Sequence, residues 1–313
     1  MTRIEVSIRG ERPGDEEAID AVVSRAFGKM DEANLVRMLR DRQSGFDPDL
    51  SVCAWSGERL VGHTGLLPVS LRLLGRTVRA AVVAPVAVIP ECQRQGIGAA
   101  MLAWGHRAAM ERGIVLTFLN GHPGYYPRHG YAACFGFAGV TVDPERLPAP
   151  GPVLQAWPVR IEDIPWLREC DDREWREVDF SWPRGGRLSE WTIEGVNAVL
   201  WRTGDGRRAA YTLARAGQAF SGGTLDAILG DDPALIRQLL AQLRPARLNH
   251  HHPAGWLARQ VLGPAWAICT ASRSDAAMAC PIQPGVLDEY LAAVESGRRL
   301  PGTTNWPIPF IMC

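Results

Sequence analysis

The sequence predicts a mixed α/β fold in two tandem domains, each built of strands and helices. In residues 4–119, short alternating or fully apolar runs, typical of strands, are interspersed with segments whose apolar residues recur at helical spacing. The proline-rich run 147–152 can continue neither a helix nor a sheet, which marks a linker. The order strand, loop, helix at 82–112 returns loosely at 224–243, which indicates a tandem repeat. We therefore place the domains at 1–146 and 153–285, followed by a C-terminal helix and tail at 286–313.

The first half of the chain alternates helices and strands. Helices are expected from Asp15, with Ile19, Val22 and Val23 on one face, then over 32–42 and over 98–112, where Gly113 ends the last one. Strands are expected at 4–8, 51–55, 60–69, 71–74, 77–89 and 114–119.

The second half repeats this plan more loosely. Strands are expected at 154–159, 198–202, 209–213 and 224–229, and helices at 163–177, 233–243 and 286–295. An acidic run surrounds Trp175, and we expect it to be a solvated helix face rather than a site for a cationic amine. Its members are Asp171, Asp172, Glu174, Glu177 and Asp179.

Composition excludes several classes of partner. The chain has 34 basic and 34 acidic side chains, so it lacks the basic excess of a nucleic-acid-binding protein. The longest apolar stretch, 80–90, is too short to span a bilayer, and residues 1–12 contain no signal-peptide core. Seven cysteines are dispersed without a Cys-x-x-Cys pair, which favours reduced thiols and a cytoplasmic location. We expect no metal, not even at His250–His252, where adjacent side chains point different ways.

A glycine-containing loop follows the most apolar strand of the chain. The strand 82–89 leads into Gln93-Arg94-Gln95-Gly96-Ile97-Gly98, where a helix is expected to begin. Glycines allow the backbone to approach a bulky ligand, and the free N–H groups and dipole of a helix start attract a diphosphate. The loop is not a Walker motif, because no Gly-Lys-Ser/Thr follows, and its glycine spacing differs from the dinucleotide-binding fingerprint.

This segment resembles the acyl-CoA loop of the GCN5-related N-acetyltransferases (GNAT), whose pattern is Gln/Arg-x-x-Gly-x-Gly/Ala after a bulged strand. Gln93, Gly96 and Gly98 match that pattern, and Pro85–Val88 matches the strand that binds the pantetheine arm. The resemblance implies a GNAT fold in both domains, with a mixed, mostly antiparallel central sheet flanked by helices, and acetyl-CoA as co-substrate. The residues expected to bind it are Val86, Ala87, Val88, Gln93, Arg94, Gln95, Gly96, Ile97, Gly98, Asn120 and Gly121.

A second motif lies at residues 120–131, directly after the strand at 114–119. It resembles the Tyr-Tyr-x-Arg-Phe-Gly-Phe/Tyr segment of the same superfamily, especially of its YhbS-like and Eis-like branches, with His129 where Phe is usual. The resemblance implies that Tyr126 protonates the departing CoA thiolate. A phenol with a pKa of about 10 keeps its proton at neutral pH and can donate it. The alternative is that Tyr125, Tyr126 and Tyr131 are packing aromatics.

The general base is less clearly marked. An amine must lose a proton before it attacks a thioester, but the strand 77–88 lacks the glutamate that many family members place there. His122 is a candidate because it is expected beside the thioester. The terminal carboxylate of Cys313 is another, since Eis-like enzymes use their chain end in this way. For His63 a structural role is favoured. Four residues lie where the family's substrate-side helices sit, and no individual role is assigned to them: Arg25, Phe27, Met30 and Glu32.

The second domain is expected to be inactive. Its corresponding strand, 224–229, runs into Gly230-Asp231-Asp232-Pro233, whose carboxylates would repel a diphosphate. The Eis-like enzymes continue into a third, sterol-carrier-like domain, for which this chain leaves no room, so their aminoglycoside specificity is not carried over.

The sequence therefore predicts an acetyl-CoA-dependent N-acetyltransferase that moves an acetyl group to a primary amine of a small molecule by direct attack. The alternative is a non-catalytic acyl-CoA-binding sensor, which the missing strand carboxylate favours and Tyr126 argues against. The identity of the amine and the oligomeric state are left open.

Overall fold

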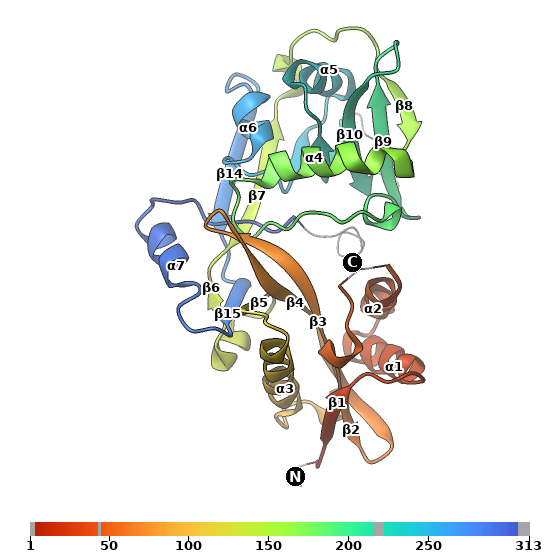
Figure 1. Cartoon of the computed structure of the whole chain (residues 1–313), viewed down its shortest axis with the longest axis vertical. Coiled ribbons are helices and arrows are strands. Elements are labelled where there is room, and N and C mark those ends of the chain that lie inside the picture. The colour runs from red at the N-terminus through yellow and green to blue at the C-terminus, as the bar shows by residue number, and fades with distance from the viewer. Residues whose placement is uncertain (1–3, 43–44, 216–221, 306–313) are drawn as a thin grey trace.

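Two domains stack along the longest axis of the molecule (Figure 1). The computed structural model describes residues 4–42, 45–215 and 222–305. The N-terminal domain is built on a sheet of strand order β1-β2-β3-β4-β5-β15-β6, and the C-terminal domain contains the sheets β12-β10-β9-β8 and β11-β13-β7-β14. The strands are β1 (Ser7–Gly10), β2 (Ser51–Ser56), β3 (Arg59–Leu73), β4 (Arg76–Val88), β5 (Leu116–Asn120), β6 (Ala132–Ala133), β7 (Gly136–Val142), β8 (Gln155–Pro158), β9 (Val196–Arg202), β10 (Arg208–Arg215), β11 (Thr224–Leu225), β12 (Ala227–Leu229), β13 (Arg247–Asn249), β14 (Ala267–Arg273) and β15 (Ala277–Pro281).

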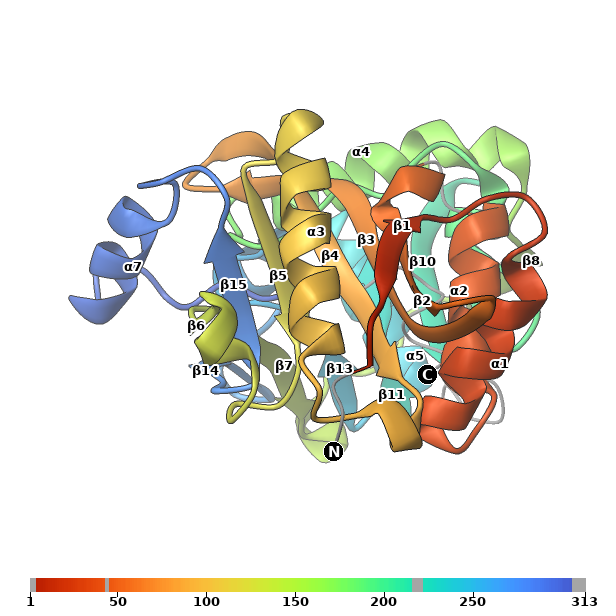
Figure 2. The ribbon, with the colours of Figure 1, turned by 90° about the horizontal axis from the view of Figure 1, so that it is seen from below.

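The helices of the N-terminal domain form where the apolar spacing predicts them. They are α1 (Glu16–Phe27), α2 (Asp31–Arg42) and α3 (Ile97–Glu111). α1 buries the predicted face, Ile19, Val22 and Val23, and ends at Gly28 in the left-handed region. α3 packs closely on β2 and β3, since an added Cβ at Gly105 would lie 2.8 Å from the Leu66 side chain. Seen from below, α3 runs beside β4 and β5, with α1 and α2 to one side (Figure 2).

Strand β3 is one continuous element, although two separate strands are expected at 60–69 and 71–74. It pairs with β2 only as far as Ser51↔Gly65. Pro68 lies beyond this point, where β2 no longer pairs with that edge of β3. A proline, which lacks the backbone N–H, is tolerated at such a free strand edge.

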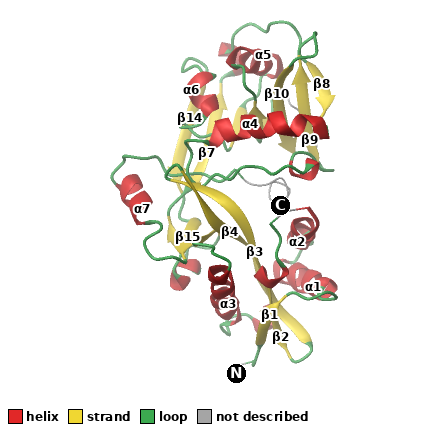
Figure 3. Cartoon of the chain, viewed as in Figure 1, coloured by secondary structure: helices red, strands yellow, loops and turns green. Residues whose placement is uncertain are grey.

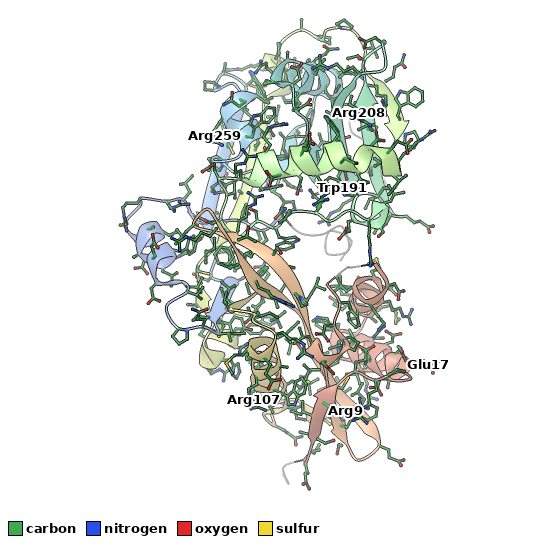
Figure 4. The ribbon with its side chains drawn as sticks, in the orientation of Figure 1. Arg9, Glu17, Arg107, Trp191, Arg208 and Arg259 are labelled. Carbon is green, nitrogen blue, oxygen red and sulfur yellow. The ribbon has the colours of Figure 1, made fainter. Side chains whose placement is uncertain are left out.

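The C-terminal domain repeats the strand, helix, strand order of the first domain. The helices of this domain are α4 (Ile164–Trp175), α5 (Pro233–Leu243) and α6 (Trp256–Gln260). A last helix, α7 (Asp288–Glu295), follows β15, and all helices are red in Figure 3. β11 is parallel to β13 across α5, as β4 is parallel to β5 across α3. The expected strand 224–229 divides at Asp226 into β11 and β12, which belong to different sheets. Trp191 is fully buried below α4, where its ring meets Tyr211 edge to face (Figure 4).

The two domains exchange strands. β15, which follows the C-terminal domain in sequence, lies between β5 and β6 of the N-terminal sheet, where Ala277 pairs with Asn120 and Pro281 with Leu116. Conversely, β7 pairs with β13 and β14 of the C-terminal domain. β15 fits a central position because Ala277 to Cys280 are all buried. The ranges 1–146 and 153–285 therefore each contain one strand that completes the sheet of the other domain (Figure 1).

The acidic run near Trp175 is largely buried, so the expectation of a solvated face is wrong for Asp171, Glu174 and Asp179. Each carboxylate is satisfied by a partner that is distant in sequence, which compensates its burial. Asp171 accepts from the backbone and guanidinium of Arg184, Glu174 from Leu257 N and the His251 ring, and Asp179 from Leu74 N and Arg299.

Replacing Arg184 by alanine is expected to destabilise the protein strongly. The Arg184–Asp171 pair has its atoms 2.6 Å apart, with side chains only 5% and 1% exposed. Burial raises the pKa of Asp171, and the guanidinium opposes that rise. Removing one partner of a buried pair costs about 3–5 kcal/mol of unfolding free energy, which urea denaturation measures.

The matched control for this prediction is Arg176→Ala. Arg176 pairs with Asp172 on the same helix but in solvent, so we expect a loss of about 1 kcal/mol or less. The Arg184→Ala deficit should shrink as the pH falls, because protonation removes the buried charge of Asp171. Equal losses in the two variants would contradict the prediction.

Candidate active site

The site begins where β4 and β5 separate. These parallel strands pair only from Ala80↔Leu116 to Val82↔Phe118. A β-bulge follows in β4, where Ala84 and Pro85 together oppose Gly65 of β3. Beyond the bulge, the side chains of β4 alternate in direction, so Val86 and Val88 line a cavity and Ala87 is buried. The separation leaves room for a ligand between the two strands.

The predicted glycine loop connects β4 to α3. Arg94 and Gly96 adopt positive φ values of 60° and 84°, which turn the chain sharply into the helix. No side chain caps the start of α3, so its first N–H groups can receive an anion. Gln93 donates a hydrogen bond from its side chain to Val88 O at 3.0 Å, and the side chain of Gln95 instead accepts from Ile4 N.

A cavity of about 720 Å³, here called the helix-end cavity, lies over this helix start. Two arginines, Arg94 and Arg128, line it and supply positive charge. Tyr125 lies against the first turn of α3, since an added Cβ at Gly98 would be 2.6 Å from its hydroxyl oxygen. The described residues that line the cavity are Val86, Val88, Cys92, Gln93, Arg94, Gly96, Ile97, Gly98, Ala99, His122, Gly124, Tyr125, Tyr126, Arg128 and His129.

A second cavity, of about 570 Å³, lies between the two domains and is here called the interdomain cavity. Three residues, Val86, His122 and Tyr126, line both cavities, which therefore meet at this point. The described residues around the interdomain cavity are Phe27, Glu32, Leu35, Val82, Val83, Ala84, Pro85, Val86, Asn120, Gly121, His122, Tyr126, Arg215 and His250.

Tyr126 is held in place by close packing. Its ring lies on Gly121, where an added Cβ would collide with Cε2, and it meets the Tyr125 ring edge to face with centroids 5.0 Å apart. Burial raises the pKa of Tyr126 to about 12, so the phenol is protonated at neutral pH. Tyr131, by contrast, is buried outside both cavities, and its hydroxyl is hydrogen-bonded to Thr117 and His106.

The candidate general bases differ in their position relative to the two cavities. His122 lies where the two cavities meet. His63 lines neither of them: it is fully buried, contacts Ser51 Oγ through Nε2 at 2.9 Å, and burial lowers its pKa to about 3. Cys313 lies outside the described residues.

Of the eleven residues expected to bind the coenzyme, seven line the helix-end cavity. Asn120 and Gly121 line the interdomain cavity instead, and Ala87 and Gln95 line neither. The sequence reasoning missed Arg128, although it lies within the quoted tyrosine motif. It also missed Arg215 and His250, which come from the C-terminal domain and carry no local signal.

Clusters of metal ligands and membrane-spanning helices were sought in the part of the chain that the structure describes. It contains no group of three His, Cys, Asp or Glu side chains arranged for a metal ion. His251 is bonded to Glu174 and Ile228 N, and His252 to Pro301 O. In the same residues, no helix combines the length and apolar character needed to cross a bilayer.

Comparison with known proteins identifies the family. Residues 7–145 match the model of the acetyltransferase (GNAT) domain. The chain is 34% identical over 139 residues to the Escherichia coli (strain K12) protein named uncharacterized N-acetyltransferase YjhQ, a match that covers 44% of this chain and 72% of that protein. The chain therefore belongs to the GNAT acetyltransferase family, and its class is that of the acyltransferases, as the motifs predict.

Solved structures extend the likeness beyond the matched domain. A GCN5-related N-acetyltransferase from Anabaena variabilis aligns with a TM-score of 0.67 at 11% identity, over 89% of this chain and 73% of that one. Eis1 from Mycobacterium abscessus aligns with a TM-score of 0.61 at 17% identity, over 89% and 74%. Because both alignments continue past the linker, the predicted tandem GNAT fold is confirmed.

Proposed function

We propose that this GNAT protein transfers the acetyl group of acetyl-CoA to a primary amine of a small molecule. One observation carries the proposal: the helix-end cavity and the interdomain cavity meet at Val86, His122 and Tyr126. A thioester at that point would be reached by the coenzyme from one side and by the acceptor from the other. Such an arrangement brings two substrates together for direct attack.

The coenzyme would occupy the helix-end cavity. Its diphosphate suits the uncapped start of α3, with Arg94 and Arg128 close enough to line the same cavity. Its pantetheine arm would lie along Val86 and Val88, in the space that opens where β5 leaves β4.

Tyr126 would act as the general acid and His122 as the general base. The amine nitrogen attacks the carbonyl carbon of the thioester, the C–S bond breaks, and the Tyr126 hydroxyl donates its proton to the departing thiolate. His122 takes the proton that the attacking amine loses, and the phenolate regains a proton from solvent. The Cys313 carboxylate stays a predicted alternative base.

We assign the transfer to the N-terminal domain alone. In the C-terminal domain the start of α5 is already capped, because Asp232 accepts from Ala234 N and Leu235 N. A carboxylate at this position repels a diphosphate, which supports an inactive second domain. A cytoplasmic location, expected from the dispersed cysteines, stays a prediction.

The test is release of CoA thiol from acetyl-CoA in the presence of a panel of amines. We expect release that depends on one class of amine and saturates with it. Tight binding of acetyl-CoA without amine-dependent release would instead support the non-catalytic sensor. The absence of both would contradict any role in acyl-CoA chemistry.

A further inference from the structure

The interdomain cavity has charged groups of opposite sign on its two walls. Glu32, on α2 of the N-terminal domain, supplies a carboxylate, and Arg215, at the end of β10 of the C-terminal domain, supplies a guanidinium. Much of the lining is apolar, including Phe27, Leu35 and Pro85. An acceptor that fills this cavity meets a negative group, a positive group and an apolar surface.

Glu32 has an oxygen that lacks a protein partner. Among the described residues, nothing donates a hydrogen bond to its Oε2, although this atom is buried. The other oxygen, Oε1, is 3.4 Å from Lys29 Nζ at the surface, and the side chain as a whole is only 18% exposed. Buried carboxylate oxygens are normally hydrogen-bonded, so the negative charge of Glu32 is little compensated by the described protein groups, and a cation in the cavity would compensate it through the electric field.

Arg215 also has unused hydrogen-bonding capacity. Its nearest carboxylate in the described chain is Asp226, whose Oδ2 is 4.0 Å from Arg215 Nε, which is too far for a hydrogen bond. The other oxygen of Asp226 accepts from Asn249 Nδ2 at 2.8 Å. The Arg215 side chain is half exposed, so its guanidinium fork can still bind a carboxylate.

His250 shares the wall with Arg215 but adds no charge at neutral pH. Burial lowers its pKa to about 4, although nearby Asp226 opposes that shift. The permanent positive charge of this wall therefore comes from Arg215.

We infer that the acceptor is an amino carboxylate, an amine that also carries a carboxylate group on a largely apolar body. Glu32 binds its ammonium group before transfer, and Arg215 binds its carboxylate. This inference rests on the proposed acetyl transfer and specifies its substrate class. It makes the C-terminal domain a source of acceptor specificity, although that domain is not expected to bind the coenzyme.

The test compares matched pairs of amines that differ only in the carboxylate. The pairs are L-leucine with 3-methylbutylamine, L-phenylalanine with phenethylamine, and 6-aminohexanoate with pentylamine. Thiol release gives kcat/KM for each. We expect the amino carboxylate of at least one pair to exceed its partner by about 10-fold or more, the range of a charge-assisted hydrogen bond.

Two variants assign that preference to residues. Arg215→Gln is expected to raise KM for the amino carboxylate by about 10-fold or more and to leave the plain amine and acetyl-CoA unchanged. Arg215→Lys, which retains the charge, should keep part of the preference. Glu32→Gln should weaken both members of each pair. The control is Arg244→Gln, since Arg244 pairs with Glu145 on the surface and lines neither cavity.

Different outcomes would overturn the substrate class inferred here and the proposed acetyl transfer. Preference for plain amines, or an equal effect of Arg215→Gln on both members of a pair, would overturn the inference and leave acetyl transfer standing. Binding of acetyl-CoA without thiol release for any amine would overturn the proposed function, and the inference with it.

Discussion

Replacing Tyr126 by phenylalanine is expected to lower kcat by about 10²- to 10⁴-fold, the usual contribution of a positioned general acid. The phenylalanine ring can keep the packing on Gly121 and Tyr125, so the affinity for acetyl-CoA should change little. The substitution removes only the proposed donation of a proton from the hydroxyl to the CoA thiolate. Steady-state thiol release and equilibrium titration with CoA measure the two quantities separately.

The control is Tyr131→Phe, which removes a hydroxyl that binds Thr117 and His106 outside the cavities. It should reduce stability while kcat stays near the wild-type value. The pH profile gives a further check. Because the pKa of Tyr126 is raised to about 12, kcat should not fall through pH ~10, where an ordinary tyrosine is half deprotonated. Unchanged turnover in Tyr126→Phe would remove this residue from the proposed role.

Replacing Gly96 by glutamate is expected to abolish coenzyme binding, with Kd for CoA raised by more than about 100-fold. Two effects add at this position. Gly96 has a φ of 84°, which side-chain-bearing residues adopt only with strain, and it lies at the uncapped start of α3. The new carboxylate would occupy the place proposed for the diphosphate and repel it. Calorimetric titration with CoA measures the loss.

Gly113→Glu provides a matched control. Gly113 also has a positive φ, of 69°, and follows the other end of the same helix, with open space around it. The Gly113→Glu variant introduces the same charge and comparable backbone strain, but we expect it to bind CoA as the wild-type protein does. If Gly96→Glu bound CoA as tightly as the wild-type protein, the diphosphate would have to lie elsewhere.

The helix-end cavity could be predicted because its sequence signals are local. The apolar strand, the Gly-x-Gly loop and the helix start are consecutive in sequence, and the structure places Gly96 and Gly98 in one cavity. Where a residue expected in this segment does not line the cavity, strand geometry is one reason. Ala87 is adjacent to two lining valines, but alternation along β4 turns its side chain into the core.

The interdomain cavity could not be predicted in the same way, since its residues meet only through tertiary structure. Glu32 and Arg215 are separated by most of the chain, and no spacing rule connects them. The buried carboxylates are a similar case. From the sequence alone, Asp171 and Glu174 are expected on a solvated helix face. The fold buries them by placing their partners Arg184 and His251 beside them.

The strand exchange also has a consequence for the order of events during synthesis. Domains usually fold as they leave the ribosome, the N-terminal one first. Here β5 has its neighbour β15 only after residue 281 has been made, because nearly all of the second domain lies between them in the chain. Until then the β5 edge is an unpaired, apolar strand that invites association with other chains. Protection of that edge is therefore expected to matter until β15 has been synthesised and can pair with β5.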